Sequence, residues 1–264
     1  MAEGPNPPKS GVGKRFVPLE NNPEVMSKLM HNLGMSEKLD FHDVYSIDEP
    51  DLLAIVPRPA HALLLVFPVS ETYENFRRQE DADKQEYNGS GEGEPVVWYK
   101  QTIGNACGLI GLLHGVSNGQ ARSYINARSL TPARQNPEPD SDLARLVDSA
   151  ISRSPVERAN LLYESQALET AHQSAAAGGD TAAPEAEQSV DLHYVCFVKD
   201  KRGRLWEMDG RRKGPLDRGV LDAGDDVLSE KALELGVRRF IDREIKAGGG
   251  EQRFSLIALA QGFD

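Results

Sequence analysis

One stretch of the chain combines a candidate nucleophile with the local structure that would activate it. Residues 101–108 read QTIGNACG and lead into the apolar run Leu109 to Leu113, which has the character of a helix. Cys107 is therefore predicted at or near a helix N-terminus, where backbone N–H groups and the helix dipole stabilise a thiolate. Gly104 and Gly108 leave room for a substrate backbone. The pattern favours a nucleophile over a buried structural cysteine, which is the usual role of a lone one.

A cysteine nucleophile generally needs a base and a group that orients the base. His114 follows Cys107 by two helical turns, roughly 10 Å, which is too far for a direct hydrogen bond, so we interpret it as a packing residue. His193 lies on a predicted strand, and the strand after it returns and ends at Asp209. Asp209 could hold the His193 imidazole and stabilise its cation, although spacing alone leaves this pairing open. The remaining histidines are interpreted as structural or solvated: His31, His42, His61 and His172.

Two further residues near these positions receive contrasting interpretations. Gln101 could donate a hydrogen bond to a developing oxyanion, with the backbone N–H of Cys107 as the second donor, but alone it is a weak signal. Cys196 falls in the middle of the predicted strand and on the face opposite His193, so we expect it in the core.

The elements that must position these residues alternate between helices and strands. Asn22 and Pro23 begin a helix that Gly34 ends, Ser46 to Glu49 has capping-box spacing before a short helix, and Ser70 precedes a polar one. Further helices are expected over 140–153, from Ser154, and over 226–246. Strands are expected over 41–45, 61–69, 96–99, 192–198, 205–208 and 254–259. About six strands with six or seven helices indicate an α/β domain.

Composition excludes several classes of protein. The chain has 264 residues, 39% of them hydrophobic, and no apolar run reaches the roughly 18 residues of a membrane helix. Residues 1–15 do not resemble a secretory signal, and two cysteines make no disulfide framework and no zinc site, so we expect a cytoplasmic protein. A net charge of −11 argues against non-specific nucleic-acid binding. The charge favours a partner with a basic surface, or it serves only solubility.

Two segments are predicted to lack regular structure. Residues 1–14 are expected to be a disordered leader, with a single domain over 15–264. From Glu164 to Ser189, Leu168 is the only large aliphatic residue and there is no Lys or Arg, so the segment cannot offset its ordering entropy by burial. Its position before His193 favours a lid near the active site, and a domain linker is the alternative.

Residues 101–114, QTIGNACGLIGLLH, closely resemble the active-site motif of the ubiquitin C-terminal hydrolases, a family of cysteine deubiquitinases (peptidase family C12). The resemblance runs from about residue 15 to the last residue and is most like the short, single-domain members. Further matches in the family's order are Val17 to Val25, Val56 to Pro59, Leu64 to Pro68, Asp191 to His193 and Trp206 to Arg211. One departure is Gly115, where a small Ala or Ser is expected and glycine should loosen the helix slightly.

The resemblance implies roles for the residues already singled out. It implies Cys107 as nucleophile, His193 as general base and acid, Asp209 as the orienting carboxylate and Gln101 as oxyanion donor. It also implies a papain-like α/β fold, with a central, mostly antiparallel sheet flanked by helices and a knotted backbone. The segment of about 164–190 would correspond to the family's active-site crossover loop.

The resemblance also implies the activity and the partner. We expect hydrolysis of thioester, ester, amide or peptide bonds at the C-terminal glycine of ubiquitin, with small or unfolded leaving groups preferred. Because the ubiquitin tail carries arginines, acidic residues should line its approach, and Glu20, Glu24 and Asp43 lie in segments similar to ubiquitin-contacting ones. Each could equally be ordinary surface or capping. No cofactor or metal is expected, and the protein is expected to be a monomer.

Three alternatives stay open at this point. A hydrolase for a ubiquitin-like modifier would use the same chemistry. A non-catalytic ubiquitin-binding protein would not explain why all four chemical positions carry competent residues. An unrelated acidic scaffold would leave that set of residues unexplained.

Overall fold

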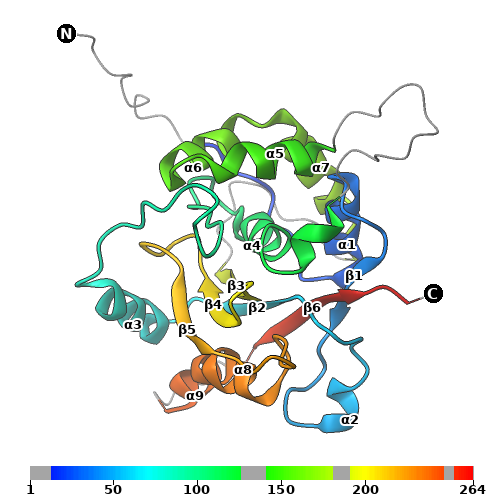
Figure 1. Cartoon of the computed structure of the whole chain (residues 1–264), viewed down its shortest axis with the longest axis vertical. Coiled ribbons are helices and arrows are strands. Elements are labelled where there is room, and N and C mark those ends of the chain that lie inside the picture. Colours follow the sequence, from blue (N-terminus) through cyan, green and yellow to red (C-terminus); the bar gives the residue numbers. More distant parts are fainter. Residues whose placement is uncertain (1–12, 126–140, 181–190, 247–252, 264) are drawn as a thin grey trace.

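A six-stranded antiparallel sheet divides the molecule into two layers of helices (Figure 1). The computed structural model describes residues 13–125, 141–180, 191–246 and 253–263. Neighbouring strands follow the order β1-β6-β2-β3-β4-β5, and every neighbouring pair is antiparallel. The strands are β1 Leu39–Asp43, β2 Ala62–Pro68, β3 Leu192–Lys199, β4 Arg204–Met208, β5 Leu216–Val220 and β6 Ser255–Gln261. The predicted α/β class with a central antiparallel sheet is confirmed, and the knot stays a prediction.

The centre of the sheet is apolar on both faces, as the sequence of β2 predicts. All seven residues of β2 are buried, and β2 pairs with β3 so that Phe67 lies opposite His193. Side chains of a strand alternate between its faces, so Tyr194 and Cys196 enter one core while Val195 and Phe197 enter the other. Cys196 is therefore a core residue on the face away from His193, as expected.

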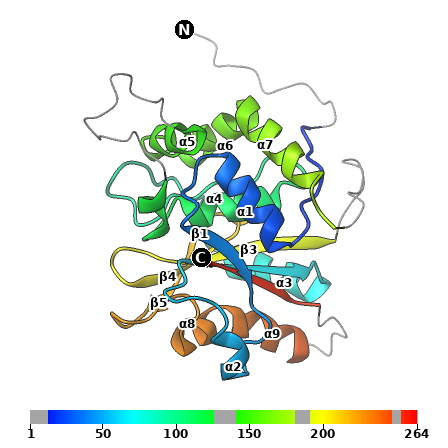
Figure 2. The same cartoon turned by 90° about the vertical axis from the view of Figure 1, so that its right-hand side faces the viewer.

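Helices cover both faces of the sheet (Figure 2). One layer holds α1 Pro23–Asn32, α4 Cys107–Val116, α5 Asp142–Ile151, α6 Pro155–Glu164 and α7 Gln166–Ala176. The opposite layer holds α2 Pro50–Leu53, α8 Glu230–Leu235 and α9 Val237–Lys246, and α3 Glu71–Asp81 packs against α9. Each layer has its own apolar core against the sheet. None of the helices in the described ranges has the length and apolar character needed to span a bilayer.

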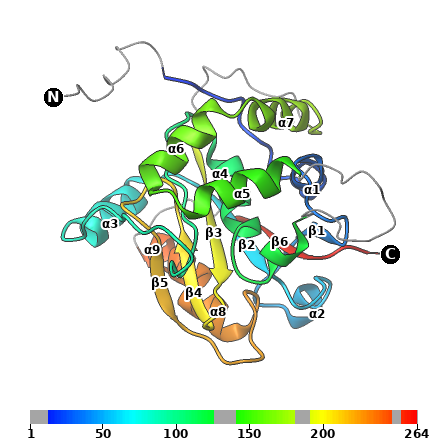
Figure 3. The same ribbon diagram turned by 45° about the horizontal axis from the view of Figure 1, so that its top comes forward.

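Helix α4 lies directly on β2 and β3, with α5 and α6 outside it (Figure 3). Glycines allow this close approach. A Cβ at Gly111 would lie 3.0 Å from Cδ2 of Leu64, and one at Gly115 would lie 3.1 Å from Cβ of Ala62. Gly115, expected to loosen the helix, therefore lets α4 pack closely on the sheet.

Residues 96–99, predicted to be a strand, belong to none of the strands of the described chain. Side chains of α4 and the turn after it take the place of a partner strand. The amide of Asn118 bonds both the N–H and the carbonyl of Val97, at 2.7 and 2.9 Å, and Nε2 of His114 accepts from the N–H of Tyr99 at 2.9 Å. The backbone polar groups of a buried segment are thus satisfied without a sheet.

The predicted loop beginning at Glu164 is wrong for residues 166–176, which form α7. Ser165 caps this helix, which packs against α1 and buries the side chains of Leu168, Ala171, His172 and Ala175. His172 is buried, and its Nε2 lies 2.7 Å from the carbonyl oxygen of Val17. Residues 181–190 lie outside the described residues, as do residues 1–12 of the predicted leader.

Two smaller predictions also differ from the structure, and one strand was missed. Ser46 does not cap α2; its hydroxyl accepts from the backbone of Asp48 and Glu49, and the helix begins at Pro50. The helix expected over 226–246 is two helices, α8 and α9, which separate at Gly236. Strand β5 was not predicted, because its sequence, LDRGV, lacks strand alternation.

Candidate active site

Cys107 is the first residue of α4, as its sequence context predicts. Asn105 has a φ of +57°, the only positive φ of a non-glycine residue in the described ranges, and this left-handed turn directs the chain into the helix. No side chain caps α4, so the positive end of its dipole acts on Cys107. The Cys107 sulfur lies 4.0 Å from the carbonyl oxygen of Leu192, the residue before His193. The candidate nucleophile and candidate base are therefore neighbours.

His193 and Asp209 form a buried pair at the end of the sheet. Nε2 of His193 lies 2.8 Å from Oδ1 of Asp209, and both side chains are almost inaccessible to solvent. The same Oδ1 accepts from the backbone N–H of Arg211 at 2.8 Å, and Oδ2 accepts from the hydroxyl of Tyr73. Because Nε2 faces Asp209, the other ring nitrogen of His193 is left for the Cys107 thiol.

Burial and charge act in opposite directions on this pair. Burial lowers the pKa of His193, but the charge and hydrogen bond of Asp209, with a smaller effect of Cys107, outweigh it and raise that pKa to about 9. Burial would raise the pKa of Asp209, but His193 and the hydrogen bond from Tyr73 hold it well below its ordinary value. At neutral pH the pair is an imidazolium and a carboxylate. The thiolate is the form of a cysteine that attacks a carbonyl carbon, and a neighbouring imidazole is the group that usually takes the thiol proton.

Gln101 lies in the turn before α4 and is tied to the turn that carries Asp209. Its backbone N–H donates to the carbonyl of Gly210 at 2.9 Å, and its side-chain Nε2 donates to the carbonyl of Ile103 at 3.3 Å. The amide nitrogen carries two N–H groups, so one is left for an oxyanion. A Cβ at Gly210 would lie 3.0 Å from Cβ of Gln101, so only glycine allows this close approach. The structure thus brings all four predicted catalytic residues to one end of the sheet, and their roles stay predictions.

His114 has the packing position that the helical spacing predicts. It is fully buried, accepts from the N–H of Tyr99, and stacks on the ring of that tyrosine. Burial lowers its pKa to about 4, so it is neutral at physiological pH. Nε2 of His31, like Nε2 of His42, lies 2.8 Å from a backbone carbonyl oxygen. These contacts fit the structural roles expected for these histidines.

Glu20, Glu24 and Asp43 line one groove of about 660 Å³, although they come from distant parts of the sequence. Asp40 and Asp180 line it as well, so five carboxyl groups face the same space. Partial burial raises the pKa of Asp43. The apolar side chains that line the groove and are exposed to solvent are those of Tyr45, Ile55 and Phe263. The groove therefore offers an acidic surface with apolar edges.

The groove adjoins the start of α4. A Cβ at Gly108, the residue after Cys107, would lie 3.3 Å from Leu19, which immediately precedes Glu20. The hydroxyl of Tyr194 donates to the carbonyl of Leu19 at 3.3 Å, and both Cys107 and Glu20 act electrostatically on that tyrosine. The acidic groove and the thiol therefore share neighbouring residues.

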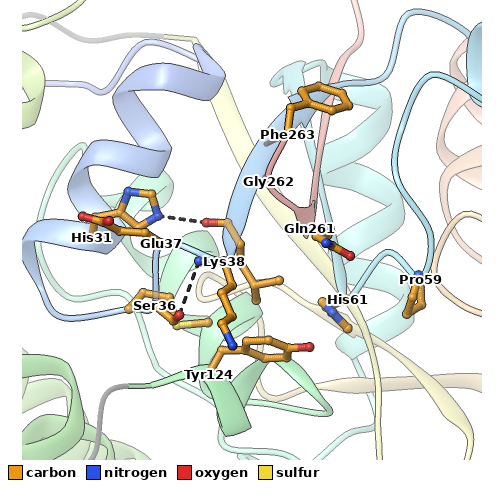
Figure 4. A pocket seen from close by; sticks show the side chains of 12 residues that line it. His31, Ser36, Glu37, Lys38, Pro59, His61, Tyr124, Gln261, Gly262 and Phe263 are labelled. Carbon is orange, nitrogen blue, oxygen red and sulfur yellow. Dashed lines mark hydrogen bonds between the residues drawn. The ribbon is translucent and has the colours of Figure 1, made fainter.

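A larger cavity, of about 810 Å³, lies at the other end of the sheet (Figure 4). It is lined by residues that include His31, His61, Lys38 and Tyr124, and Figure 4 shows His31 bonded to the backbone of β1 rather than turned toward His61. His61 precedes β2 while Phe67, opposite His193, is near its end. A strand of this length spans roughly 20 Å, so the larger cavity is separate from the predicted catalytic residues.

Sequence reasoning missed the residues that hold the pair in place from outside the hairpin. The hydroxyl of Tyr73 reaches Asp209 from α3, and the indole N–H of Trp98 donates to the carbonyl of Asp209 at 3.2 Å. Arg212 binds Asp81 of α3 at 2.8 Å and so ties the turn after Asp209 to that helix. These contacts join residues more than 100 positions apart, and no local pattern announces them. The described chain holds no cluster of three or more His, Cys, Asp or Glu arranged to bind a metal.

Comparisons with known proteins agree with the geometry. The family model described as "Ubiquitin carboxyl-terminal hydrolase, family 1" matches residues 16–242. Ubiquitin carboxyl-terminal hydrolase 3 of Arabidopsis thaliana is 33% identical over 254 residues, which cover 96% of this chain and 97% of the relative. Ubiquitin carboxyl-terminal hydrolase isozyme L1 of Homo sapiens is 34% identical over 247 residues, which cover 94% of this chain and 99% of the relative.

Solved structures share the fold. The catalytic domain of Trichinella spiralis UCH37, bound to ubiquitin vinyl methyl ester, has a TM-score of 0.66 at 18% identity. The match covers 96% of this chain and 97% of that domain. The α/β fold expected from the resemblance is therefore confirmed, and the knotted backbone path stays a prediction.

Proposed function

Because the chain belongs to ubiquitin carboxyl-terminal hydrolase family 1, whose members are thiol-dependent hydrolases, we propose that it hydrolyses bonds to the C-terminal glycine of ubiquitin, with Cys107 as nucleophile. The observation that carries this proposal is the position of the buried His193–Asp209 pair beside Cys107. Nε2 of His193 lies 2.8 Å from Oδ1 of Asp209. The carbonyl oxygen of Leu192, the residue before His193, lies 4.0 Å from the Cys107 sulfur.

In the first step, the Cys107 thiolate attacks the carbonyl carbon of the ubiquitin glycine. A C–S bond forms, and the carbonyl oxygen becomes an oxyanion that the second N–H of Gln101 and the backbone N–H of Cys107 stabilise. The His193 imidazolium then gives its proton to the leaving amine, alcohol or thiol as the bond to the carbonyl carbon breaks. The product is a thioester between ubiquitin and Cys107.

In the second step, neutral His193 removes a proton from water, and the resulting hydroxide attacks the thioester carbon. The C–S bond breaks, which leaves the Cys107 thiolate beside the His193 imidazolium, and the carboxylic acid formed on ubiquitin gives its proton to solvent as ubiquitin leaves. Asp209 holds the imidazole through Nε2 and stabilises its cation in both steps without taking the proton. Every residue of this cycle comes from one chain, so we propose that a monomer suffices.

The acidic groove is the proposed binding site for the basic tail of ubiquitin. Glu20, Glu24 and Asp43 line it beside the start of α4, and opposite charges across an interface raise the association rate and fix the register of the partner. The exposed rings of Tyr45 and Phe263 supply apolar contact area at its edges.

We also propose a preference for small or unfolded leaving groups. Asp180 is bound to Asn22 at the groove, with 3.0 Å between Oδ2 and Nδ2, and Leu192 lies beside Cys107. The described chain thus lies both at the groove and beside the thiol, and a bulky folded leaving group would have to share this space. Folded di-ubiquitin should therefore be cleaved much more slowly than a small ester or amide of ubiquitin.

The test is hydrolysis of ubiquitin that carries a fluorogenic amide on its C-terminus, by the wild type and by Cys107→Ser. We expect turnover by the wild type and none by the variant. A parallel assay with ubiquitin-like modifiers carrying the same group measures the choice of modifier. Turnover of such a modifier but not of ubiquitin, or equal turnover by Cys107→Ser, would refute the proposal.

A further inference from the structure

Tyr73 contacts the predicted catalytic machinery from outside it, and the proposed cycle gives it no part. It lies in the first turn of α3 and is 1% exposed. Its hydroxyl donates to Oδ2 of Asp209, whereas Oδ1 is already occupied by His193 and by the backbone N–H of Arg211. The two carboxylate oxygens thus have separate donors, and Tyr73 is the side-chain donor to Oδ2 within the described structure.

The ring of Tyr73 is held on several sides. The ring of Phe67 meets it edge-on at 4.7 Å, the ring of Phe240 stacks on it at 6.2 Å, and the guanidinium of Arg243 lies 5.7 Å from its centre. Such contacts fix the plane of the ring and leave the hydroxyl little freedom.

The backbone of Tyr73 is fixed as well. Its N–H donates to the hydroxyl of Ser70 at 2.9 Å, and that hydroxyl donates to Oε2 of Glu244 on α9 at 2.7 Å. Helix α9 therefore supports both the ring and the backbone of Tyr73. A side chain held in this way is suited to fixing the orientation of another group.

The charges around Tyr73 keep its hydroxyl a donor. Burial, the neighbouring Asp209 and Glu207 raise its pKa well above the ordinary value, and Arg212 only partly opposes them. The charged groups that face the hydroxyl and the carboxylate come from every element packed there: His193 and Glu207 of the sheet, Asp209 and Arg212 after β4, Arg77 of α3 and Arg243 of α9. The hydroxyl is neutral throughout the physiological pH range.

We propose that Tyr73 is a positioning residue that fixes the carboxylate of Asp209, and through it the imidazole of His193, in the orientation that serves Cys107. The inference rests on the proposed function. Without the hydroxyl, Oδ2 would be buried with no side-chain donor, an unfavourable state for a charged group. The carboxylate would turn toward other donors or admit water, and the imidazole would lose its fixed partner.

The test replaces only the hydroxyl, as Tyr73→Phe, and uses Tyr99→Phe as the matched control. Tyr99 is also fully buried, and its hydroxyl bonds Ser117 at 3.0 Å, away from Asp209. Fluorogenic ubiquitin hydrolysis is followed from pH 6 to 10 for both variants and the wild type, alongside thermal unfolding. For Tyr73→Phe we expect kcat to fall by about tenfold to a hundredfold, KM to stay within about twofold, and the alkaline limb of the profile to move to lower pH.

Each outcome decides between the roles. Tyr99→Phe should lose thermal stability yet keep kcat and the alkaline limb of the wild type. If Tyr73→Phe and Tyr99→Phe had the same kcat and the same alkaline limb of the pH profile, the positioning role of Tyr73 would be overturned. If Tyr73→Phe is partly unfolded, placing 4-aminophenylalanine at the position restores an N–H donor, and a well-folded variant without recovered kcat would overturn it too. Failure of the wild type to hydrolyse the substrate would instead refute the proposed function.

Discussion

Replacing Asp209 by asparagine removes one charge from the buried pair while preserving its shape. In the wild type Asp209 is the main group that opposes the effect of burial on His193 and raises its pKa from 6.5 to about 9. Burial alone lowers that pKa, so the imidazole of Asp209→Asn should titrate below 6.5. The alkaline limb of the pH profile should therefore move to lower pH in the variant. In the wild type the His193 imidazolium is present below pH 9 and is lost as the pH rises through 9, whereas in the variant it is already lost below pH 6.5.

The size of the effect can be worked from these two values. The difference between 6.5 and about 9 corresponds to about 3 kcal/mol of stabilisation of the His193 cation. At pH 7.5 nearly all of the wild-type imidazole is protonated, but at most about a tenth of it is in the variant. Asparagine also donates where a carboxylate accepts, so the wrong tautomer is favoured, which can cost up to about 10⁴ in kcat. We expect kcat/KM of Asp209→Asn to fall by about 10² or more.

Two assays measure the protonation of His193 and its effect on Cys107. Hydrolysis of a fluorogenic ubiquitin amide from pH 6 to 10 gives the alkaline limb, and alkylation of Cys107 by iodoacetamide over the same range reports the thiolate without ubiquitin. The matched control is Asp200→Asn, at the opposite end of the β3–β4 hairpin. Asp200 is also buried, accepting from the backbone of Arg202 and Arg204 and from the indole of Trp206. The Asp200→Asn variant should lose thermal stability but keep the wild-type pH profile.

A specific result would refute the electrostatic reasoning. If Asp209→Asn kept more than about a tenth of wild-type kcat/KM at pH 7.5, with its alkaline limb still near pH 9, Asp209 would not be what keeps His193 protonated.

Three further changes test other parts of the structure. Gly210→Ala should lower kcat by about tenfold to a hundredfold, because a Cβ there would lie 2.8 Å from Cγ2 of Ile110 and 3.0 Å from Cβ of Gln101 and so displace the oxyanion donor; unchanged steady-state kinetics would contradict this. Combining Glu24→Gln with Asp43→Asn should raise KM at low salt and flatten its rise with salt, because exposed charges are screened over about 8 Å at physiological ionic strength; an unaltered salt slope would remove the groove from ubiquitin binding. His114→Ala should cost about 2 kcal/mol or more of unfolding free energy, measured by denaturant titration, with the pH profile retained; loss of activity in a fully stable variant would place His114 in the catalytic cycle.

The predictions that succeeded depend on short stretches of sequence. The position of Cys107 at a helix start follows from a polar, glycine-containing turn before an apolar run. The pairing of His193 with Asp209 needs only a hairpin, since 16 positions separate them. Asn22 caps α1 through its own side chain, as the residue type and the following proline predict.

The predictions that failed depend on tertiary packing. The segment 166–176 has one large aliphatic residue, so its composition indicates a loop, but that leucine, His172 and two alanines are buried in a helix that packs against α1. Residues 96–99 have the composition of a strand, yet Asn118 and His114 satisfy their backbone in place of a partner. A pattern within one segment cannot show which other segment will pack on it.

The residues that hold the candidate active site in place could not be predicted from the sequence for the same reason. Tyr73 lies 136 positions from Asp209, and its own surroundings in the sequence indicate only a polar helix. The groove likewise joins residues of α1, β1 and Asp180, which the sequence alone does not bring together. Residue types and spacing nominated Cys107 and His193, the resemblance implied the roles of the four residues, and the contacts that orient them required the fold.

The central claim is that Cys107, and not Cys196, forms a covalent bond with the C-terminal glycine of ubiquitin. Labelling with a ubiquitin probe that carries a thiol-reactive group at its C-terminus, followed by peptide mass spectrometry, tests it most directly on the wild type, Cys107→Ser and Cys196→Ser. Cys196 is fully buried and burial raises the pKa of its thiol, so it should not react. We expect one adduct on Cys107 in the wild type and in Cys196→Ser, and none in Cys107→Ser. An adduct on Cys196, or labelling that survives Cys107→Ser, would contradict the assignment.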